Sequence, residues 1–240
     1  MMISVVVPVR NEMDNVAALI VEIHQALSHL EAYEMIFIDD GSTDETRCKL
    51  ESAMQSFPTL RVLRHQHSCG QSRAIHTGVQ AAQYPWIVTM DGDGQNDPAD
   101  IVGLMAIIEQ QANQLWMVAG YRHDRHDNWW RRFSSKVANL VRQAVLHDHT
   151  PDTGCGLKLF RRDKFLCLPY FDHMHRFLPA LMQMAGGQVV SVKVKHRTRK
   201  FGISNYGTLD RMFIGIVDLL GVIWLKSRHS LPTIVEVLRG

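Results

Sequence analysis

Short apolar runs alternate with longer amphipathic segments through the first half of the chain, and this alternation constrains the fold more than any other feature. Apolar runs at residues 3–9, 35–38, 60–63, 86–90 and 115–119 predict buried strands. Between them, residues 16–30, 43–57, 71–82 and 100–110 predict helices. Strands that alternate with helices indicate βαβ units. We therefore expect an α/β fold, Rossmann-like, with a mainly parallel sheet flanked by helices.

Polar residues follow four of these strands. They occupy residues 10–12, 39–42, 91–93 and 120–122. In parallel sheets, ligands bind beyond the carboxyl ends of the strands, so the site is expected where these four loops meet. The first strand is not followed by the G-x-G-x-x-G motif of a dinucleotide-binding fold, which argues against an oxidoreductase.

The third of these loops contains two acids. Asp91 and Asp93 follow the strand at 86–90, with a glycine after each. Residues two apart on a strand lie on one side, so both carboxylates can point to one position, and Gln95 adds a neutral oxygen. Hard oxygen donors of this kind suit Mg²⁺ or Mn²⁺ with positions left open for phosphate oxygens. Taken alone, the stretch also fits an acidic Asx turn before a helix.

The second loop contains Asp39 and Asp40. Part of it has a structural explanation, because Ser42 and Glu45 match the S-x-x-E capping box of the next helix. Capping does not explain a second carboxylate at the end of a strand. An acceptor at this position suits the N–H of a nucleobase or the hydroxyls of a ribose, although the pair alone would be an ordinary turn.

Composition narrows the classes of protein. A net charge of +2 argues against a protein that coats nucleic acid. The four cysteines form no C-x-x-C pair and indicate reduced thiols. The chain enters a strand at once, so no signal peptide is expected. No apolar run reaches the roughly 18–20 residues that a transmembrane helix needs. The thirteen histidines include three H-x-H pairs, at 65/67, 147/149 and 173/175, which are interpreted as surface or loop residues.

The second half is less regular. Residues 130–146 and 177–184 predict helices, and residues 189–196 alternate as an edge strand with one charged face. A final apolar helix is expected at residues 208–226. Its broad apolar face and Trp224 fit packed core, a dimer surface, or an interfacial helix on an anionic membrane. The chain is therefore divided into a catalytic domain, 1–205, and a C-terminal helix and tail, 206–240.

Several motifs together resemble those of a known family. They occupy residues 5–8 with 11–12, 39–44, 90–95 with 97–98, 154–158, 176–180, 196–197 and 202–207. These motifs resemble the inverting family 2 glycosyltransferases of the GT-A fold, and among them the polyprenyl-phosphate sugar synthases, the group that includes dolichol-phosphate mannose synthase. Each motif is weak alone, but their order and spacing extend the resemblance over nearly the whole chain.

The resemblance implies a set of site residues. A nucleoside-diphosphate sugar, linked to UDP or GDP, would be held by Pro8, Arg10, Glu12 and Asp39, with Asp40 in support. The cation, Mg²⁺ or Mn²⁺, would be bound by Asp91, Asp93 and Gln95. The phosphate of a polyprenyl acceptor would be held by Arg122, Arg131 and Ser135, with Arg197 and Arg199 from a basic loop. Three positions depart from the family pattern: Arg10 replaces a frequent tyrosine, Gly94 a leucine or alanine, and Asn205 a lysine.

The expected reaction is in-line attack of the lipid phosphate on the anomeric carbon, with inversion. A phosphate monoester has a second pKa near 6, so it needs no strong general base. Asp152 is the candidate to orient the acceptor, or to take a proton if the acceptor is a hydroxyl. The protein would be cytoplasmic and peripheral on the inner face of the cell membrane, with a homo-oligomer possible. Two alternatives remain: a glycosyltransferase acting on a saccharide hydroxyl, and a non-catalytic nucleotide-sugar-binding regulator.

Overall fold

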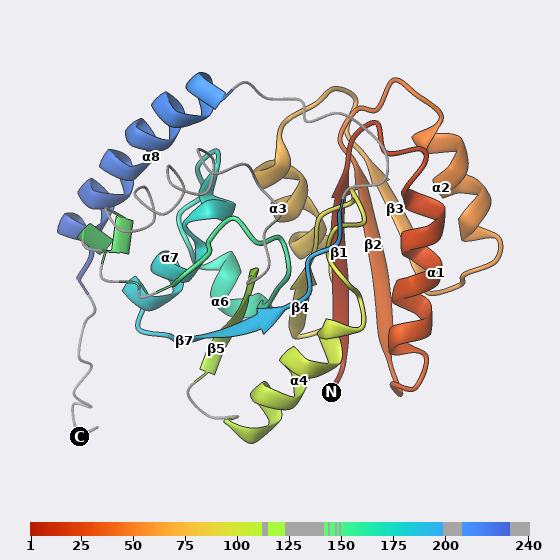
Figure 1. Cartoon of the computed structure of the whole chain (residues 1–240), viewed down its shortest axis with the longest axis horizontal. Helices are drawn as coiled ribbons and strands as arrows, with labels where there is room; N and C mark the ends of the chain where they lie inside the picture. Colours follow the sequence, from red (N-terminus) through yellow and green to blue (C-terminus); the bar gives the residue numbers. More distant parts are fainter. Residues whose placement is uncertain are drawn as a thin grey trace, which may run out of the picture.

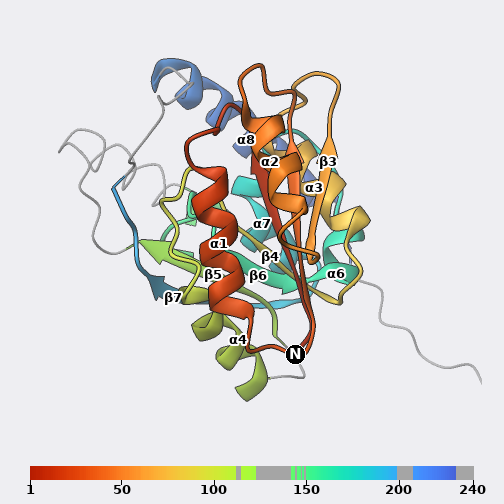
Figure 2. The ribbon, with the colours of Figure 1, turned by 90° about the vertical axis from the view of Figure 1, so that its right-hand side faces the viewer.

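The described residues form a seven-stranded sheet with helices on both faces (Figures 1 and 2). This computed structural model describes residues 1–111, 115–122, 142–143, 145–146, 148, 150–198 and 208–230. The strands lie in the order β3-β2-β1-β4-β6-β5-β7. Their bounds are β1 (Ile3–Val9), β2 (Tyr33–Asp39), β3 (Leu60–Arg64), β4 (Trp86–Thr89), β5 (Leu115–Arg122), β6 (Lys158–Arg161) and β7 (Gln188–Val194).

Among the described strands, β6 alone runs against its neighbours. It pairs antiparallel with β4 on one side and with β5 on the other, whereas the other pairs are parallel. The carboxyl ends of β1, β2, β4 and β5 therefore lie at one edge of the sheet, and β6 begins at that same edge. The predicted α/β class with a mainly parallel sheet is confirmed.

Two groups of helices cover the two faces of the sheet. One face is packed by α1 (Val16–Leu27), α2 (Thr46–Met54) and α4 (Asp100–Gln110). The other is packed by α3 (Gln71–Ala81), α6 (Arg162–Leu166), the short 3₁₀ helix η1 (Met174–Arg176), α7 (Leu178–Met184) and α8 (Thr208–Arg228).

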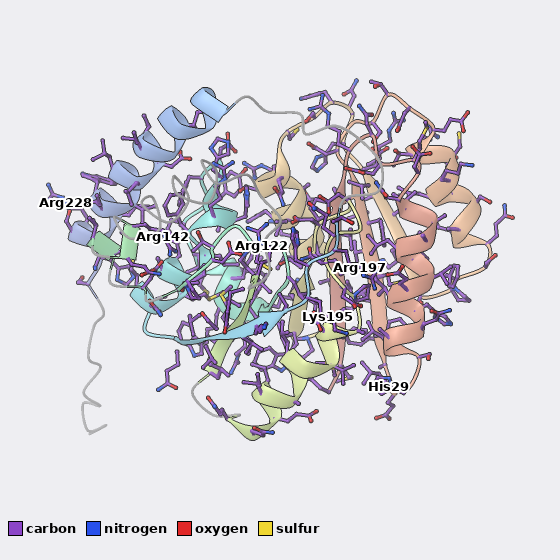
Figure 3. The ribbon with its side chains drawn as sticks, viewed as in Figure 1. His29, Arg122, Arg142, Lys195, Arg197 and Arg228 are labelled. Carbon is purple, nitrogen blue, oxygen red and sulfur yellow. The ribbon has the colours of Figure 1, made fainter. Side chains whose placement is uncertain are left out.

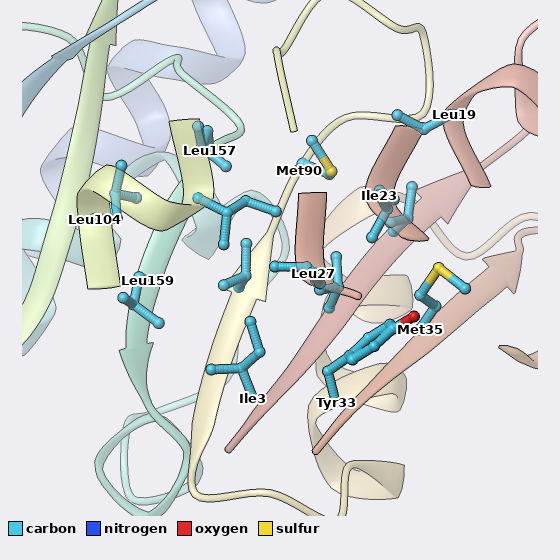
Figure 4. Packing of buried hydrophobic residues seen from close by; sticks show 14 of the residues in the cluster. Ile3, Leu19, Ile23, Leu27, Tyr33, Met35, Met90, Leu104, Leu157 and Leu159 are labelled. Atoms are coloured by element: carbon cyan, nitrogen blue, oxygen red, sulfur yellow. The ribbon is translucent and has the colours of Figure 1, made fainter. Parts of the chain in front are cut away.

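The alternation of side chains along β1 explains why both faces are covered. Val5 and Val7 belong to the hydrophobic cluster beneath α1, while Val6 belongs to the cluster beneath α3. All three are fully buried. Figure 4 shows Ile23 and Leu27 of α1 packed into the first cluster. A strand buried on both faces must be apolar at successive positions, which is the pattern of residues 3–9.

The C-terminal helix α8 packs on the domain with one side and leaves apolar side chains exposed on the other. Val222 is fully buried, and Leu219 packs against the second cluster. Ile216, Val217, Leu220 and Trp224 are 52–61% exposed. Within the described residues, no helix combines the length and hydropathy that crossing a bilayer requires. The expected domain boundary at 205 lies outside the described residues.

Two local predictions differ from the structure or fall outside it. Helix α2 begins at Thr46 instead of residue 43, and Ser42 forms no capping box. Its hydroxyl accepts a hydrogen bond from Asn11 N at 3.0 Å, which joins the loops after β1 and β2. Most of the helix predicted at 130–146 lies outside the described residues. The predicted edge strand is β7, at the end of the sheet.

Candidate active site

The acidic turn after β4 is held by hydrogen bonds within the loop. Asp91 N donates to Asn96 Oδ1 at 3.1 Å, and Gln95 N donates to Asp93 Oδ1 at 3.1 Å. Gly92 lets the turn lie against the end of β1, because a Cβ at that position would be 2.5 Å from Val9 Cγ1. The turn is therefore fixed to the sheet edge where β1 also ends.

The carboxyl group of Asp91 is partly buried, which disfavours its charged form. Burial raises the pKa of its carboxyl group to about 6, and the charge of Asp93 raises it in the same direction, whereas Lys158 and Arg122 act against the shift. Gln71 Nε2 donates to Asp91 Oδ1 at 2.8 Å. A divalent cation bound between these two carboxylates would offset the repulsion that raises the pKa of Asp91, so the donor set fits Mg²⁺ or Mn²⁺.

The loop before β6 passes directly over Asp91. A Cβ on Gly156 would lie 2.4 Å from Asp91 Cγ and 2.4–2.5 Å from both carboxylate oxygens. Thr89 Oγ1, at the end of β4, donates to Gly156 O at 2.9 Å, and this hydrogen bond fixes the loop next to Asp91. Only glycine at position 156 leaves room for the carboxylate in its present position.

Two basic side chains approach Asp91 from this loop and from β5. Arg122 forms a two-point ion pair with Asp152, with Nε–Oδ2 at 2.7 Å and Nη2–Oδ1 at 2.9 Å. Lys158 is 4% exposed and donates its Nζ to Cys155 O. Burial lowers the pKa of Lys158. Asp152 therefore holds Arg122 in position.

These groups line one cavity of about 300 Å³. Acidic Asp91 and the basic residues Arg122, Lys158 and Arg176 all contribute to its wall. Phe165, Met174 and Leu178 contribute apolar surface. The cavity can accommodate a group that carries negative charge next to an apolar portion.

Asp39, at the end of β2, is 1% exposed. Its Oδ1 accepts from Ser42 N at 2.8 Å, and its Oδ2 lies 3.2 Å from Arg64 Nε. Asp39 thus keeps the turn after β2 closed in this structure.

Asp40 binds the segment that leads into α3. Its two oxygens accept hydrogen bonds from His65 Nδ1, Ser68 Oγ, Cys69 N and Gly70 N at 2.6–2.9 Å. Burial alone would raise the pKa of Asp40, but these hydrogen bonds outweigh it and the pKa is lowered. In this structure Asp40 therefore fixes the loop before α3, and its support of a nucleotide pocket stays a prediction.

Asp40, His65 and Cys69 lie close enough together to suggest a second metal site. Both carboxylate oxygens of Asp40 already accept hydrogen bonds, and His65 Nε2 is paired with Thr77 Oγ1 at 3.0 Å. The cluster therefore acts as a hydrogen-bonded clamp for the loop, and His65 is a partly buried residue of the loop that follows β3.

The residues expected to line the donor pocket from β1 lie at the same edge. Pro8 and Glu12 are partly buried and Arg10 is exposed. Glu12 N donates to Thr46 Oγ1 at 2.9 Å, and Glu12 Oε2 accepts from Asn15 Nδ2 at 2.6 Å. The structure brings these positions next to the loop of Asp39 through the Asn11–Ser42 contact.

Two predicted site residues have partners away from the cavity. Gln95 Nε2 donates to Arg197 O at 3.3 Å, and Gln95 does not line the cavity of Asp91. Arg197 is paired with Asp97 at 2.9 Å and with Glu22 at 2.5 Å, whereas Arg122 lines the cavity (Figure 3). Arg131, Ser135 and Arg199 lie outside the described residues.

Sequence reasoning assigned no role to several cavity residues. His175 belongs to an H-x-H pair expected at the surface or in a loop; it lines the cavity, and its Nδ1 lies 2.7 Å from Ser72 Oγ. Burial, followed by the charges of Lys158 and Arg176, lowers its pKa well below the usual value. Lys158 lies in the family motif at 154–158 and Arg176 in the motif at 176–180. These motifs were the sequence signal that could have identified both residues.

Comparison with known proteins assigns the chain to a family of glycosyltransferases. The model of glycosyl transferase family 2 matches residues 4–168, and the chain belongs to this family. The predicted family resemblance is thereby confirmed.

Relatives of known function match almost the whole chain. A dodecaprenyl-phosphate galacturonate synthase of Rhizobium johnstonii is 32% identical over 235 residues, which are 96% of this chain and 69% of that protein. An undecaprenyl-phosphate 4-deoxy-4-formamido-L-arabinose transferase of Aeromonas hydrophila is 33% identical over 246 residues, 100% of this chain and 73% of that protein.

Solved structures with the same fold are more distant in sequence. The mannosyl-3-phosphoglycerate synthase of Rubrobacter xylanophilus superposes with a TM-score of 0.73 at 16% identity, covering 98% of this chain and 77% of that one. The glucosyl-3-phosphoglycerate synthase of Mycobacterium tuberculosis, in complex with Mn²⁺, UDP and glucosyl-3-phosphoglycerate, gives 0.69 at 17%, covering 97% and 81%. These likenesses confirm the GT-A fold.

Proposed function

We propose that this glycosyltransferase moves a hexose from a nucleoside-diphosphate sugar to a polyprenyl phosphate of the undecaprenyl or dolichyl type, with inversion at the anomeric carbon. The product would be a lipid-linked sugar donor for modification of cell-envelope glycans or lipids. One observation carries the proposal: acidic Asp91 and basic Arg122 line the same cavity at the carboxyl edge of the sheet. The names of the polyprenyl-phosphate relatives support the choice of acceptor.

The acidic turn is the proposed binding site for the donor's diphosphate. Asp91 and Asp93 would hold Mg²⁺ or Mn²⁺, with Gln95 joining them only if its amide turns from Arg197. The cation would neutralise charge on the departing nucleoside diphosphate. Pro8, Arg10, Glu12 and Asp39 are proposed to face the base and ribose, on the loops that the Asn11–Ser42 hydrogen bond joins. UDP-linked sugars are the first candidates, because a structural neighbour binds UDP with Mn²⁺.

The basic side of the cavity is proposed to orient the acceptor. Arg122 presents a guanidinium whose position is fixed by the two-point pair with Asp152. Asp152 is 6% exposed and is committed to that pair, so it is poorly placed to act as a general base. A phosphate acceptor is already an anion at neutral pH and needs no base, whereas a hydroxyl acceptor does. The pairing of Asp152 therefore favours a phosphate acceptor.

The exposed apolar side chains of α8 are proposed to rest on the inner face of the cell membrane, where a polyprenyl phosphate resides. Leu220 and Trp224 are 61% and 60% exposed, and Lys226 and Arg228 follow in the last turn. Basic residues beside an apolar face favour anionic lipid. Flotation with phosphatidylglycerol vesicles tests this: the wild type should float, and Leu220→Asp should remain in the protein fraction. Dimerisation through this face, in place of flotation, would contradict the membrane contact.

Transfer of labelled sugar tests the proposed reaction. Purified protein is incubated with Mn²⁺, undecaprenyl phosphate and a panel of labelled UDP- and GDP-sugars, and the product is partitioned between butanol and water. We expect butanol-extractable label with one donor, a β-linkage from an α-linked donor, and loss of turnover by at least about 100-fold in Asp93→Asn. Asp100→Asn, an acid on α4 outside the cavity, is the matched control. Label that appears only in water-soluble saccharide, or binding without transfer, would overturn the proposal.

A further inference from the structure

A second, smaller cavity adjoins the first. It measures about 130 Å³ and lies between the start of α3, the short helix η1 and α8. Gln71, Ser72, His175 and Arg176 line both cavities. Ile214 of α8 forms part of the wall of the second cavity alone. The two cavities therefore meet at η1, and the smaller one leads from the Asp91 side towards α8.

Arg176 is the cavity cation without a partner. Arg122 is committed to Asp152, and Lys158 donates to the carbonyl oxygen of Cys155. Across the part of the chain that the structure describes, the Arg176 guanidinium has neither a hydrogen bond nor an ion pair. A guanidinium that lines a cavity and has no acceptor is a binding site for an oxyanion, because its planar set of donors matches the oxygens of phosphate or carboxylate.

Two carboxylates lie near Arg176: Asp172 lines the same cavity, and the charge of Asp218 interacts with that of Arg176. His173 is paired with Asp218 of α8 at 3.1 Å, and Asp172 accepts a hydrogen bond from Tyr170 Oη at 2.8 Å. The N-terminal end of α3, at Gln71, also faces the second cavity and adds partial positive charge. His175 is held neutral by burial and by its basic neighbours. Because Asp218 and Asp172 each have another partner, the guanidinium donors of Arg176 stay open to an oxyanion within the described residues.

The apolar surface beyond this point indicates which anion fits. Ile214 is 36% exposed and lies at the edge of the exposed apolar stripe of α8, which continues through Val217 to Trp224. Figure 1 shows α8 on the side of α3 and α7. An anion bound at Arg176 with an apolar tail would place the tail on Ile214 and then on this stripe.

We propose that Arg176 binds the phosphate of the lipid acceptor, and that the first prenyl units lie against Ile214 on their way to the exposed face of α8. The inference rests on the proposed function and refines it, because it places the acceptor's entry on the α3–η1–α8 side. The same oxyanion chemistry also suits the carboxylate of an acidic sugar donor, and the test separates the two sources.

Steady-state kinetics with Arg176 variants form the test. For Arg176→Ala we expect the KM for undecaprenyl phosphate to rise at least 10-fold while the Kd for the nucleotide sugar, measured by calorimetry with Mn²⁺, changes less than twofold. Arg176→Lys should recover part of the loss, because it keeps the charge without the planar fork. Arg73→Ala is the control, since Arg73 is an exposed arginine on α3 that stacks on Tyr170 at 3.6 Å and lines neither cavity.

Ile214 supplies the second arm of the test. Ile214→Asp should raise the KM for a ten-carbon prenyl phosphate supplied in solution, where no membrane is involved, and Ile214→Leu should not. If the wild type forms no lipid-linked sugar at all, the proposed function fails. If the wild type forms the product but Arg176→Ala leaves the acceptor KM unchanged, or raises only the donor Kd, the inference is overturned and the proposed function stands.

Discussion

Substitution of Gly156 by alanine tests the geometry of the acidic turn most directly. The new Cβ would lie 2.4 Å from Asp91 Cγ, about 1 Å inside ordinary van der Waals contact, so the carboxylate must move by about that distance. The movement would also break the hydrogen bond from Gln71, which is 2.8 Å long in the present structure. A displacement of about 1 Å at a reacting site costs about 100-fold in rate, equivalent to about 2.7 kcal/mol.

The cost to folding should be much smaller. One inserted methyl group near a carboxylate that can rotate is expected to lower the free energy of unfolding by about 1 kcal/mol, or Tm by about 2–4 °C for a chain of this size. Activity and stability should therefore separate. The assays are sugar transfer with saturating Mn²⁺ and thermal unfolding on the same preparation.

Gly103→Ala is the matched control for this substitution. Gly103 lies in α4, and a Cβ there meets nothing within 4 Å. The change should leave transfer intact and stabilise the helix by about 0.5–1 kcal/mol. Gly156→Ala activity within threefold of wild type would refute the argument that this glycine sets the position of the Asp91 carboxylate.

Three further predictions follow from individual side chains. The pKa of Asp91 is raised to about 6, so the folded state binds more protons than the unfolded state between about pH 4 and 6. The contribution of Asp91 to the free energy of unfolding therefore falls as the pH rises through that window. In EDTA at pH 7, Asp91→Asn should therefore be more stable than wild type by about 1–3 kcal/mol in urea unfolding; equal or lower stability would contradict the buried charge. Asp40→Ala should lower the free energy of unfolding by about 3 kcal/mol at pH 7, because buried donors lose their acceptor, and the difference from wild type should shrink as the pH falls through the lowered pKa of Asp40. A pH-independent difference in urea unfolding would count against the charged acceptor. Asp152→Ala should raise the acceptor KM by about 10-fold or more, because the two-point pair that orients Arg122 is lost. Calorimetry should find the donor Kd unchanged. An unchanged acceptor KM would contradict this role of Asp152.

The first half of the fold could be predicted from the sequence because its signals are local. Residues 100–110 were predicted as a helix, and α4 has the same bounds. The acidic turn could be placed for the same reason: Asp91 and Asp93 follow a short apolar run, and the parallel arrangement puts the end of that strand beside the ends of β1 and β2.

The other wall of the site could not be predicted, because its contacts join distant parts of the chain. Ser72 meets His175, 103 residues away, and Thr89 meets Gly156, 67 residues away. No periodicity in the sequence encodes such pairs. For the same reason His175 was expected only as a surface or loop residue, and its place in the cavity beside Ser72 was not foreseen.

The ion pairs of the arginines could not be predicted from the sequence either. The basic residues Arg122 and Arg197 were both expected to reach a phosphate, but the sequence does not reveal that Arg122 lies beside Asp152 or that Arg197 lies beside Glu22. The ion pair of Arg122 holds it at the cavity. Arg197 would have to leave two carboxylates, those of Glu22 and Asp97, before it could bind a ligand. Charge type can be read from a sequence, but the availability of the charge depends on the folded neighbours.

The reversed strand β6 has a consequence for how the protein assembles. In the described sheet, β4 and β5 are not neighbours, and β6 joins the four strands on one side to the two on the other. The side made of β1 to β4 is built from sequential units close together in the chain, so it can form early. The sheet is completed only when β6, about 70 residues after β4, pairs with β4 and β5. This step has a high contact order and should govern the folding rate. Mutations in β6 should therefore delay the appearance of activity during refolding more than they delay the formation of helical structure.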